Sequence, residues 1–247
     1  MIFLLLFGAV PFLVGWGTHY LFGQFDWRGP VLVLLVLAVM LLVAFVWSAR
    51  KQGARRRLAV ARLEALGFHC SLKPDDAEKA AFFAPLQHLA GWIGLRKAPG
   101  CIQWLAQRNV SGAQVLLFEA AYLTGGRQVT EHPRTILAIP AALAEIGGLP
   151  GLLVARLPRL ERHALRQSEL RDARFADCAK DWRLQGDAET AARFLTPAMR
   201  AEMARSPMGE MWCIGGGWAC CVFRGFLDAE NLATFQERTM RGLMTAK

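Results

Sequence analysis

Charged side chains are missing from the start of the chain, where the first one is Asp26. The residues before it have no positive n-region, and no small-residue cleavage site occurs before residue 30, which argues against a cleaved signal peptide. Residues 1–22 are apolar apart from Thr18, His19 and Tyr20. Since a helix needs about 20 apolar residues to cross a bilayer, this stretch is predicted to be a membrane span.

A second uncharged stretch runs from Pro30 to Ser48 and predicts another span. The loop between the two, residues 23–29, is short and rich in turn-forming residues, so the spans are expected to form an antiparallel hairpin over residues 1–48. Arg28 is the one basic residue of that loop, whereas several follow the second span. The positive-inside rule then places both chain termini in the cytoplasm.

The formal net charge is +9, and it lies beyond the predicted hairpin. A basic juxtamembrane helix is expected over residues 49–67, because an apolar stripe in residues 54–66 ends at Gly67. Lysine and arginine at a membrane surface contribute on the order of 1 kcal/mol each toward anionic headgroups. The predicted membrane-surface residues are Arg50, Lys51, Arg55, Arg56 and Arg57.

Motifs for metal binding and catalysis are also missing. None of the six cysteines forms a C-x-x-C pair, and no histidine has H-E-x-x-H spacing. Residues 215–217 are three glycines between two predicted strands, without the Lys-Ser or Lys-Thr of a phosphate-binding loop, so they predict a hairpin turn. We therefore expect buried, reduced cysteines, no cofactor and no catalytic residue. We also expect no nucleic-acid partner, because no RNP-like strand occurs.

The remainder, residues 68–247, predicts one soluble α+β domain with a mainly antiparallel sheet and flanking helices, because its strands come in hairpins. Helices are expected at 77–89, near Asp187, at 197–204 and after Asp228. Strands are expected at 101–107, 113–123, 135–139, 152–157, 178–184, 211–214 and 218–223.

A second basic face is expected within residues 156–174, where Arg159, Arg162 and Arg166 recur at helical spacing. It would contact headgroups, or form an ordinary solvated helix face. Five tryptophans give this part of the chain a high aromatic content, which fits core packing, an aromatic ligand pocket or a lipid-interface surface. They are Trp92, Trp104, Trp182, Trp212 and Trp218.

The chain resembles a loose group of uncharacterised bacterial membrane proteins with two N-terminal spans and a cytoplasmic α+β domain. The resemblance rests on short stretches at residues 63–68, 115–119, 135–140 and 181–187, together with the last hairpin and helix. The resemblance supports this architecture only and carries no known activity. From the predicted spans and their orientation, the expected location is the bacterial inner membrane.

Three functions remain open from the sequence. The leading hypothesis is a membrane-anchored cytoplasmic module that acts as a non-catalytic scaffold, assembly or regulatory component and binds another protein. The alternative is a membrane-associated enzyme of unrecognised type that acts on a lipid-proximal or small cytoplasmic substrate. The third, a transport accessory, rests on His19 alone, the one ionisable group inside a predicted span.

Overall fold

The computed structural model describes Gly17 and residues 28–93, 100–124, 130–143, 146, 148, 150–156, 170, 172–175, 182–205 and 210–244. The chain divides into two compact units, Met1–Arg55 and Arg56–Lys247. The first predicted span and the loop after it lie almost wholly outside the described residues, so the predicted hairpin of two spans stays a prediction.

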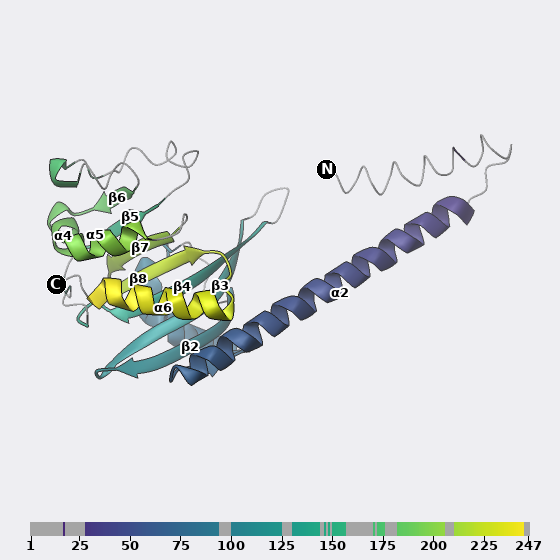
Figure 1. The fold of residues 1–247 in the computed structure, drawn as a ribbon, viewed down its shortest axis with the longest axis horizontal. Helices are drawn as coiled ribbons and strands as arrows, with labels where there is room; N and C mark the ends of the chain where they lie inside the picture. The colour runs from purple at the N-terminus through teal and green to yellow at the C-terminus, as the bar shows by residue number, and fades with distance from the viewer. Residues whose placement is uncertain are drawn as a thin grey trace. The chain divides into compact units, whose positions relative to one another are not determined.

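Helix α2, Arg28–Ala65, is the long helix of the structure (Figure 1). The stretches expected as a span (30–48) and as a juxtamembrane helix (54–66) belong to this single helix. Gly53 does not interrupt it, because one glycine costs only about 1 kcal/mol in a helix and strong helix formers surround this one. The helix ends at Ala65, and Gly67 in the turn that follows adopts a φ of 81°.

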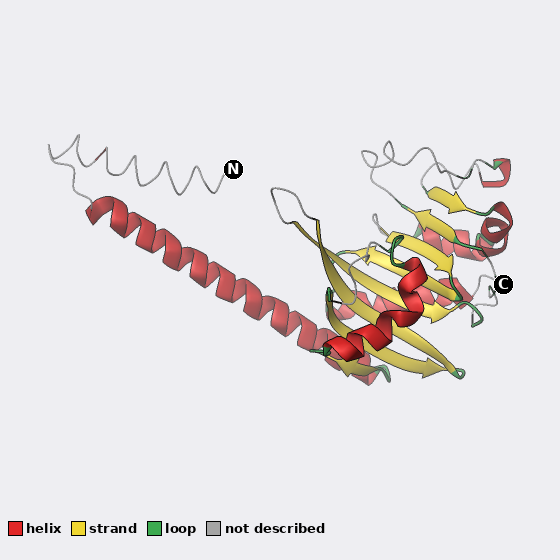
Figure 2. Cartoon of the chain, turned by 180° about the vertical axis from the view of Figure 1, so that it is seen from behind, coloured by secondary structure: helices red, strands yellow, loops and turns green. Residues whose placement is uncertain are grey.

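The second unit contains an eight-stranded sheet in which every neighbouring pair is antiparallel (Figure 2). The expected α+β class is therefore confirmed. The strand order is β1-β2-β3-β4-β8-β7-β5-β6. The strands are β1 His69–Ser71, β2 Ile102–Val110, β3 Ala113–Thr124, β4 Thr130–Pro140, β5 Leu152–Ala155, β6 Arg183–Gly186, β7 Glu210–Gly215 and β8 Trp218–Arg224.

Short helices complete the unit, and their starts follow from capping side chains. Asp75, Asp187 and Thr196 each accept a hydrogen bond from a backbone N–H in the first turn of the helix that follows. Asp228 does the same for the closing helix. The helices are α3 Asp76–Phe83, η1 Ala84–Leu89, η3 Ala173–Phe175, α4 Ala188–Phe194, α5 Pro197–Ala204 and α6 Ala229–Met244.

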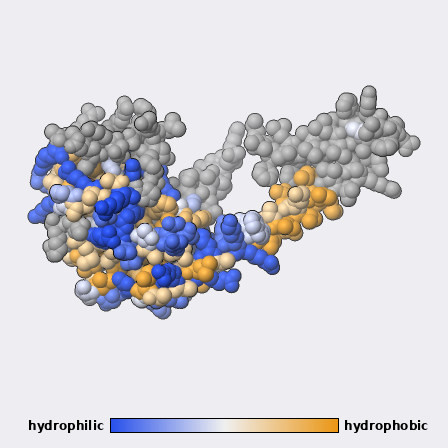
Figure 3. All heavy atoms as spheres, in the orientation of Figure 1, coloured by the Kyte–Doolittle hydropathy of each residue, from blue (hydrophilic) through white to orange (hydrophobic). Residues whose placement is uncertain are grey.

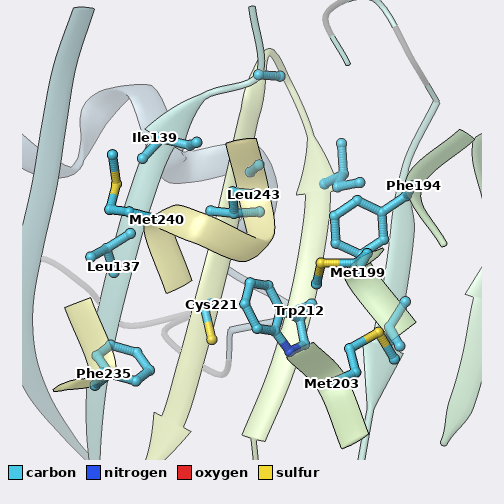
Figure 4. Close-up of a cluster of buried hydrophobic side chains, with 14 of the residues drawn as sticks. Leu137, Ile139, Phe194, Met199, Met203, Trp212, Cys221, Phe235, Met240 and Leu243 are labelled. Atoms are coloured by element: carbon cyan, nitrogen blue, oxygen red, sulfur yellow. The ribbon is translucent and has the colours of Figure 1, made fainter. Parts of the chain in front are cut away.

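The sheet buries both of its faces. One, here called the α6 face, packs against α4, α5, α6 and the end of α2. Figure 4 shows Trp212 there among side chains of α5, α6 and neighbouring strands. The other, the α3 face, packs against α3 and η1. Cys220 and Cys221, adjacent on β8, point to opposite faces and are both fully buried.

Candidate functional site

The exposed apolar surface of α2 is the first candidate for function. From Leu34 onward this helix is long and apolar enough to cross a membrane, with a mean hydropathy of 2.0 in its most apolar window and none of that window buried. Figure 3 shows these side chains as a continuous apolar surface. A soluble protein rarely exposes so large an apolar patch. Among the residues that the structure describes, no second helix meets this test.

The basic cluster follows this apolar surface on the same helix. Arg50, Lys51 and Arg57 have exposed side chains. The ammonium of Lys51 lies 5.6 Å from the ring centre of Trp47, which is itself largely exposed. Tryptophan and lysine side by side are typical of the interface between hydrocarbon and headgroups.

The other two predicted cations of the cluster have partly buried side chains. The Arg56 guanidinium donates a hydrogen bond to the Oε1 of Gln103 on β2, and both residues belong to the second unit. Arg55 buries its Nε. The cluster predicted from the sequence thus separates into Arg50, Lys51 and Arg57, which are exposed, and Arg55 and Arg56, which are partly buried.

The second predicted basic face lies outside the described residues, since Arg159, Arg162 and Arg166 are not among them. Further along the sequence, Arg174 pairs with Asp172 at 2.8 Å and with Glu189 at 3.2 Å. The hydrogen bonds that Arg174 donates hold the pKa of the Asp172 carboxyl below its usual value.

Two buried carboxylates on the α6 face bind specific donors. Glu119 accepts a hydrogen bond of 2.7 Å from the Nε1 of Trp104. Glu210, fully buried at the start of β7, forms a two-pronged ion pair with Arg238 of α6. Burial, followed by the charge of Glu210, holds the pKa of the neighbouring Cys221 thiol well above its usual range. The Trp104–Glu119 hydrogen bond thus joins β2 to β3, and the Glu210–Arg238 ion pair joins β7 to α6.

The five tryptophans differ in burial. Trp104, Trp182 and Trp212 are buried in the core of the α6 face, which agrees with the packing interpretation. Trp92 and Trp218 are partly buried against the α3 face.

A surface pocket of about 270 Å³ lies between α3 and the β2–β3 hairpin. Its wall is part apolar, and it is lined by Glu78, Ala81, Phe82, Pro85, Leu105, Gln107, Gln114 and Leu116. In the described part of the chain, no group of three or more His, Cys, Asp or Glu side chains is placed to hold a metal ion.

Three arginines in strands of the sheet were not singled out from the sequence. Arg134 on β4, Arg183 on β6 and Arg224 on β8 point to the α3 face. The sequence signal that could have placed two of them is the alternation of side chains along a strand. Arg134 lies two residues from the buried Ile136, and Arg224 lies two residues from the buried Val222, so each arginine shares a face with that apolar residue.

Comparisons with known proteins identify no family. No family model matches the chain, and no curated protein matches it. A solved structure, the crystal structure of the mycobacterial trehalose monomycolate transport factor A (TtfA), aligns with a TM-score of 0.46 at 14% identity, over 78% of this chain and 94% of that chain. A similarity of this size does not identify a shared function.

Proposed function

We propose that this protein is a membrane-anchored module whose α+β domain lies on the cytoplasmic face of the bacterial inner membrane and binds another protein as a non-catalytic scaffold, assembly or regulatory component. The observation that carries the proposal is the exposed apolar surface of α2, followed directly by exposed cations.

The order of these features along α2 supports the orientation. Trp47 and Lys51 lie where the apolar stretch ends, as expected for residues at the headgroup level. Arg50 and Arg57 are exposed beyond it. Three exposed cations near an anionic surface together contribute on the order of 3 kcal/mol, which would keep the domain on the anionic cytoplasmic side.

The anchoring is tested by fractionating cells that express the full-length chain and washing the membranes with alkaline carbonate. We expect the protein to remain in the membrane pellet, and a reporter fused after Lys247 to respond only to cytoplasmic conditions. Release by carbonate, or a reporter accessible from outside intact cells, would contradict the proposal.

Partner binding is tested on the full-length chain extracted in a gentle detergent after chemical crosslinking in cells. We expect a second protein to copurify in a fixed ratio to this chain and to crosslink to lysines of the second unit, such as Lys73 or Lys79. A preparation that contains this chain alone, with no crosslinked product above its own mass, would contradict the scaffold role.

A further inference from the structure

The surface pocket between α3 and the β2–β3 hairpin has an apolar floor that the fold holds in place. Phe82 of α3, Leu105 of β2 and Leu116 of β3 line it, and all three are buried. The ring of Phe82 meets that of Phe118 edge-on, with 5.4 Å between the ring centres, which fixes its orientation. The floor is therefore formed before any ligand binds.

The size of the pocket suits one bulky side chain. Its volume is about 270 Å³, which falls below the roughly 300–1,000 Å³ of pockets that enclose a whole small molecule. Such pockets also bury about 70–90% of their ligand, whereas Glu78 and Gln114 at the rim are exposed. A side chain on a protein surface overcomes this exposure, because its neighbours cover the rim and exclude water.

The rim offers hydrogen-bonding groups that suit a peptide. The Nε2 of Gln114 donates to the Oε1 of Gln107 at 2.6 Å. Since a side-chain amide carries two N–H donors and an acceptor oxygen, this pair still offers the Nε2 of Gln107 as a donor and the Oε1 of Gln114 as an acceptor. The Glu78 carboxylate accepts a hydrogen bond of 3.1 Å from the Ser71 hydroxyl, and a carboxylate accepts several such bonds.

The charge at the rim selects the sign of the partner. Glu78 is the only charged side chain among the described residues that line the pocket. It follows Asp75 and Asp76 at the start of α3, where Asp76 pairs with Lys79 at 3.0 Å. The chain as a whole is basic, with 29 Lys and Arg against 20 Asp and Glu, so this rim is a local negative site on a positive protein. Charge complementarity favours a cation next to the apolar anchor.

We propose that this pocket binds a segment of a partner protein in which a bulky apolar residue stands next to a lysine or arginine. The inference rests on the proposed function as a protein-binding module, and it names the surface and the chemistry of the partner. The apolar side chain packs on Phe82, Leu105 and Leu116. The neighbouring cation pairs with Glu78, and the Gln107 amide donates to a backbone carbonyl of the segment.

The inference is tested first with synthetic peptides on the full-length chain in phosphatidylcholine nanodiscs, where no detergent competes for the pocket. One short peptide, the lysine–phenylalanine peptide, carries phenylalanine between two lysines. A second carries phenylalanine between two glutamates, and a third carries alanine between two lysines. Saturation-transfer NMR measures the three dissociation constants. The lysine–phenylalanine peptide is expected to bind about tenfold more tightly than either of the others, because ring burial and charge pairing both contribute.

Ala81→Trp is the informative variant. Ala81 lines the pocket from an exposed position of α3, so an indole there fills the pocket without entering the core. Binding of the lysine–phenylalanine peptide is expected to weaken by about tenfold or more. The matched control is Ala80→Trp, at the neighbouring exposed position of α3 that does not line the pocket. This control is expected to bind as the unaltered chain does.

Glu78→Gln tests the charge separately. The glutamine oxygen still accepts from Ser71, so the substitution removes the charge and keeps the shape. We expect the lysine–phenylalanine peptide to bind about twofold to fivefold more weakly, the effect of one exposed ion pair. The matched control is Glu230→Gln, which removes an exposed carboxylate from the first turn of α6 and should change nothing.

Three results with these probes would overturn the proposal. The lysine–phenylalanine peptide fails to bind, or Ala80→Trp and Ala81→Trp bind it equally. In the third, hexylammonium binds as tightly as the peptide, which would assign the pocket to a small amphiphilic amine.

Crosslinking in cells separates this inference from the proposed function. We expect the copurifying partner to be lost from Ala81→Trp and retained by Ala80→Trp. A partner retained by both variants overturns the pocket and leaves the scaffold role standing, whereas the absence of any partner from the unaltered chain overturns both. A crosslinked product that contains only copies of this chain would assign the pocket to self-association and also overturns the proposal.

Discussion

Among single residues, the Glu210–Arg238 ion pair has the largest expected effect on stability. Replacing Arg238 with methionine leaves the fully buried Glu210 carboxylate without its counterion, and breaking a buried pair in this way costs about 3–5 kcal/mol. The free energy of unfolding, measured by urea titration of the full-length chain with tryptophan fluorescence, should fall by that amount. The double variant Glu210→Leu/Arg238→Met should recover most of the loss, because an apolar pair leaves no unpaired charge.

The control for this ion pair lies on the same helix. Arg241 pairs with Glu237 at 2.9 Å, and both side chains are more than half exposed. Glu237→Gln removes only this exposed pair and is expected to cost less than about 1 kcal/mol, because solvent screens such pairs. Equal losses for Arg238→Met and Glu237→Gln would show that burial does not set the strength of the pair.

The half-buried thiol of Cys70 gives a prediction about pH. Desolvation, followed by the nearby Glu64 carboxylate, raises its pKa to about 11. The thiolate is the reactive form. Because the pKa is raised, the thiol stays protonated through neutral pH, and its alkylation rate should rise about tenfold per pH unit up to about pH 11. Peptide-resolved mass spectrometry of iodoacetamide labelling measures this rate.

Glu64→Gln tests the electrostatic part of that shift. Without the neighbouring carboxylate, the alkylation profile of Cys70 should move to lower pH. Desolvation should still hold the pKa of the thiol above that of a free cysteine. A profile for the unaltered chain that levels off near pH 9, the ordinary thiol value, would contradict the assignment.

Within the elements, the pairing of β5 with β6 depends on Gly186. Its φ of 136° strains any residue with a side chain, and an added Cβ would meet the carbonyl oxygen of Gly151. Neither backbone can move freely, since Gly186 is paired with Leu152 in the sheet. Gly186→Ala is therefore expected to lower the free energy of unfolding by about 3 kcal/mol, as measured by urea titration.

Gly217, in the turn between β7 and β8, is the matched comparison. It also has a positive φ, 80°, but an added Cβ would have no heavy atom within 4 Å. Gly217→Ala should lower the free energy of unfolding by only about 1–2 kcal/mol, because the left-handed backbone alone is unfavourable for alanine. A loss for Gly186→Ala no larger than this would show that the close approach of Gly151 is unimportant.

Elements whose signals lie close together in the sequence were predictable. The glycines at 215–217 indicated the hairpin turn between β7 and β8, and helix α5 has the predicted bounds. Strand β1, His69–Ser71, was missed because three residues carry no alternating pattern and their pairing partner on β2 lies far along the chain.

The candidate sites also differ in whether their residues lie close together in the sequence. The basic cluster at residues 50–57 was visible because its members are contiguous in the sequence. Arg134, Arg183 and Arg224 are brought to one face only by the pairing of β4 with β8 and by the order β8-β7-β5-β6. Long-range pairing depends on the whole sheet, so no local pattern predicted that these arginines would lie near each other.

At the scale of the whole molecule, the proposed membrane anchor leads to a prediction about the number of segments that span the bilayer. Helix α2 has the composition of a span, and residues 1–22 are predicted from the sequence to be another. An arginine at the centre of a span costs about 2.5–3.5 kcal/mol, so Val39→Arg/Val43→Arg opposes insertion of α2 by roughly 5–7 kcal/mol. With a second span in place, we expect this variant to stay in the carbonate-washed membrane pellet.

The counterpart in the first stretch is Val10→Arg/Val14→Arg, a pair of valines with the same spacing of four. Either pair of substitutions alone should leave the chain in the pellet, and the two pairs together should release it. Leu58→Arg/Ala61→Arg, at exposed positions of α2 beyond the basic cluster, controls for added charge and should change nothing. If Val39→Arg/Val43→Arg alone releases the protein, α2 is the sole anchor and the predicted hairpin is wrong, since a remaining span would have retained the chain.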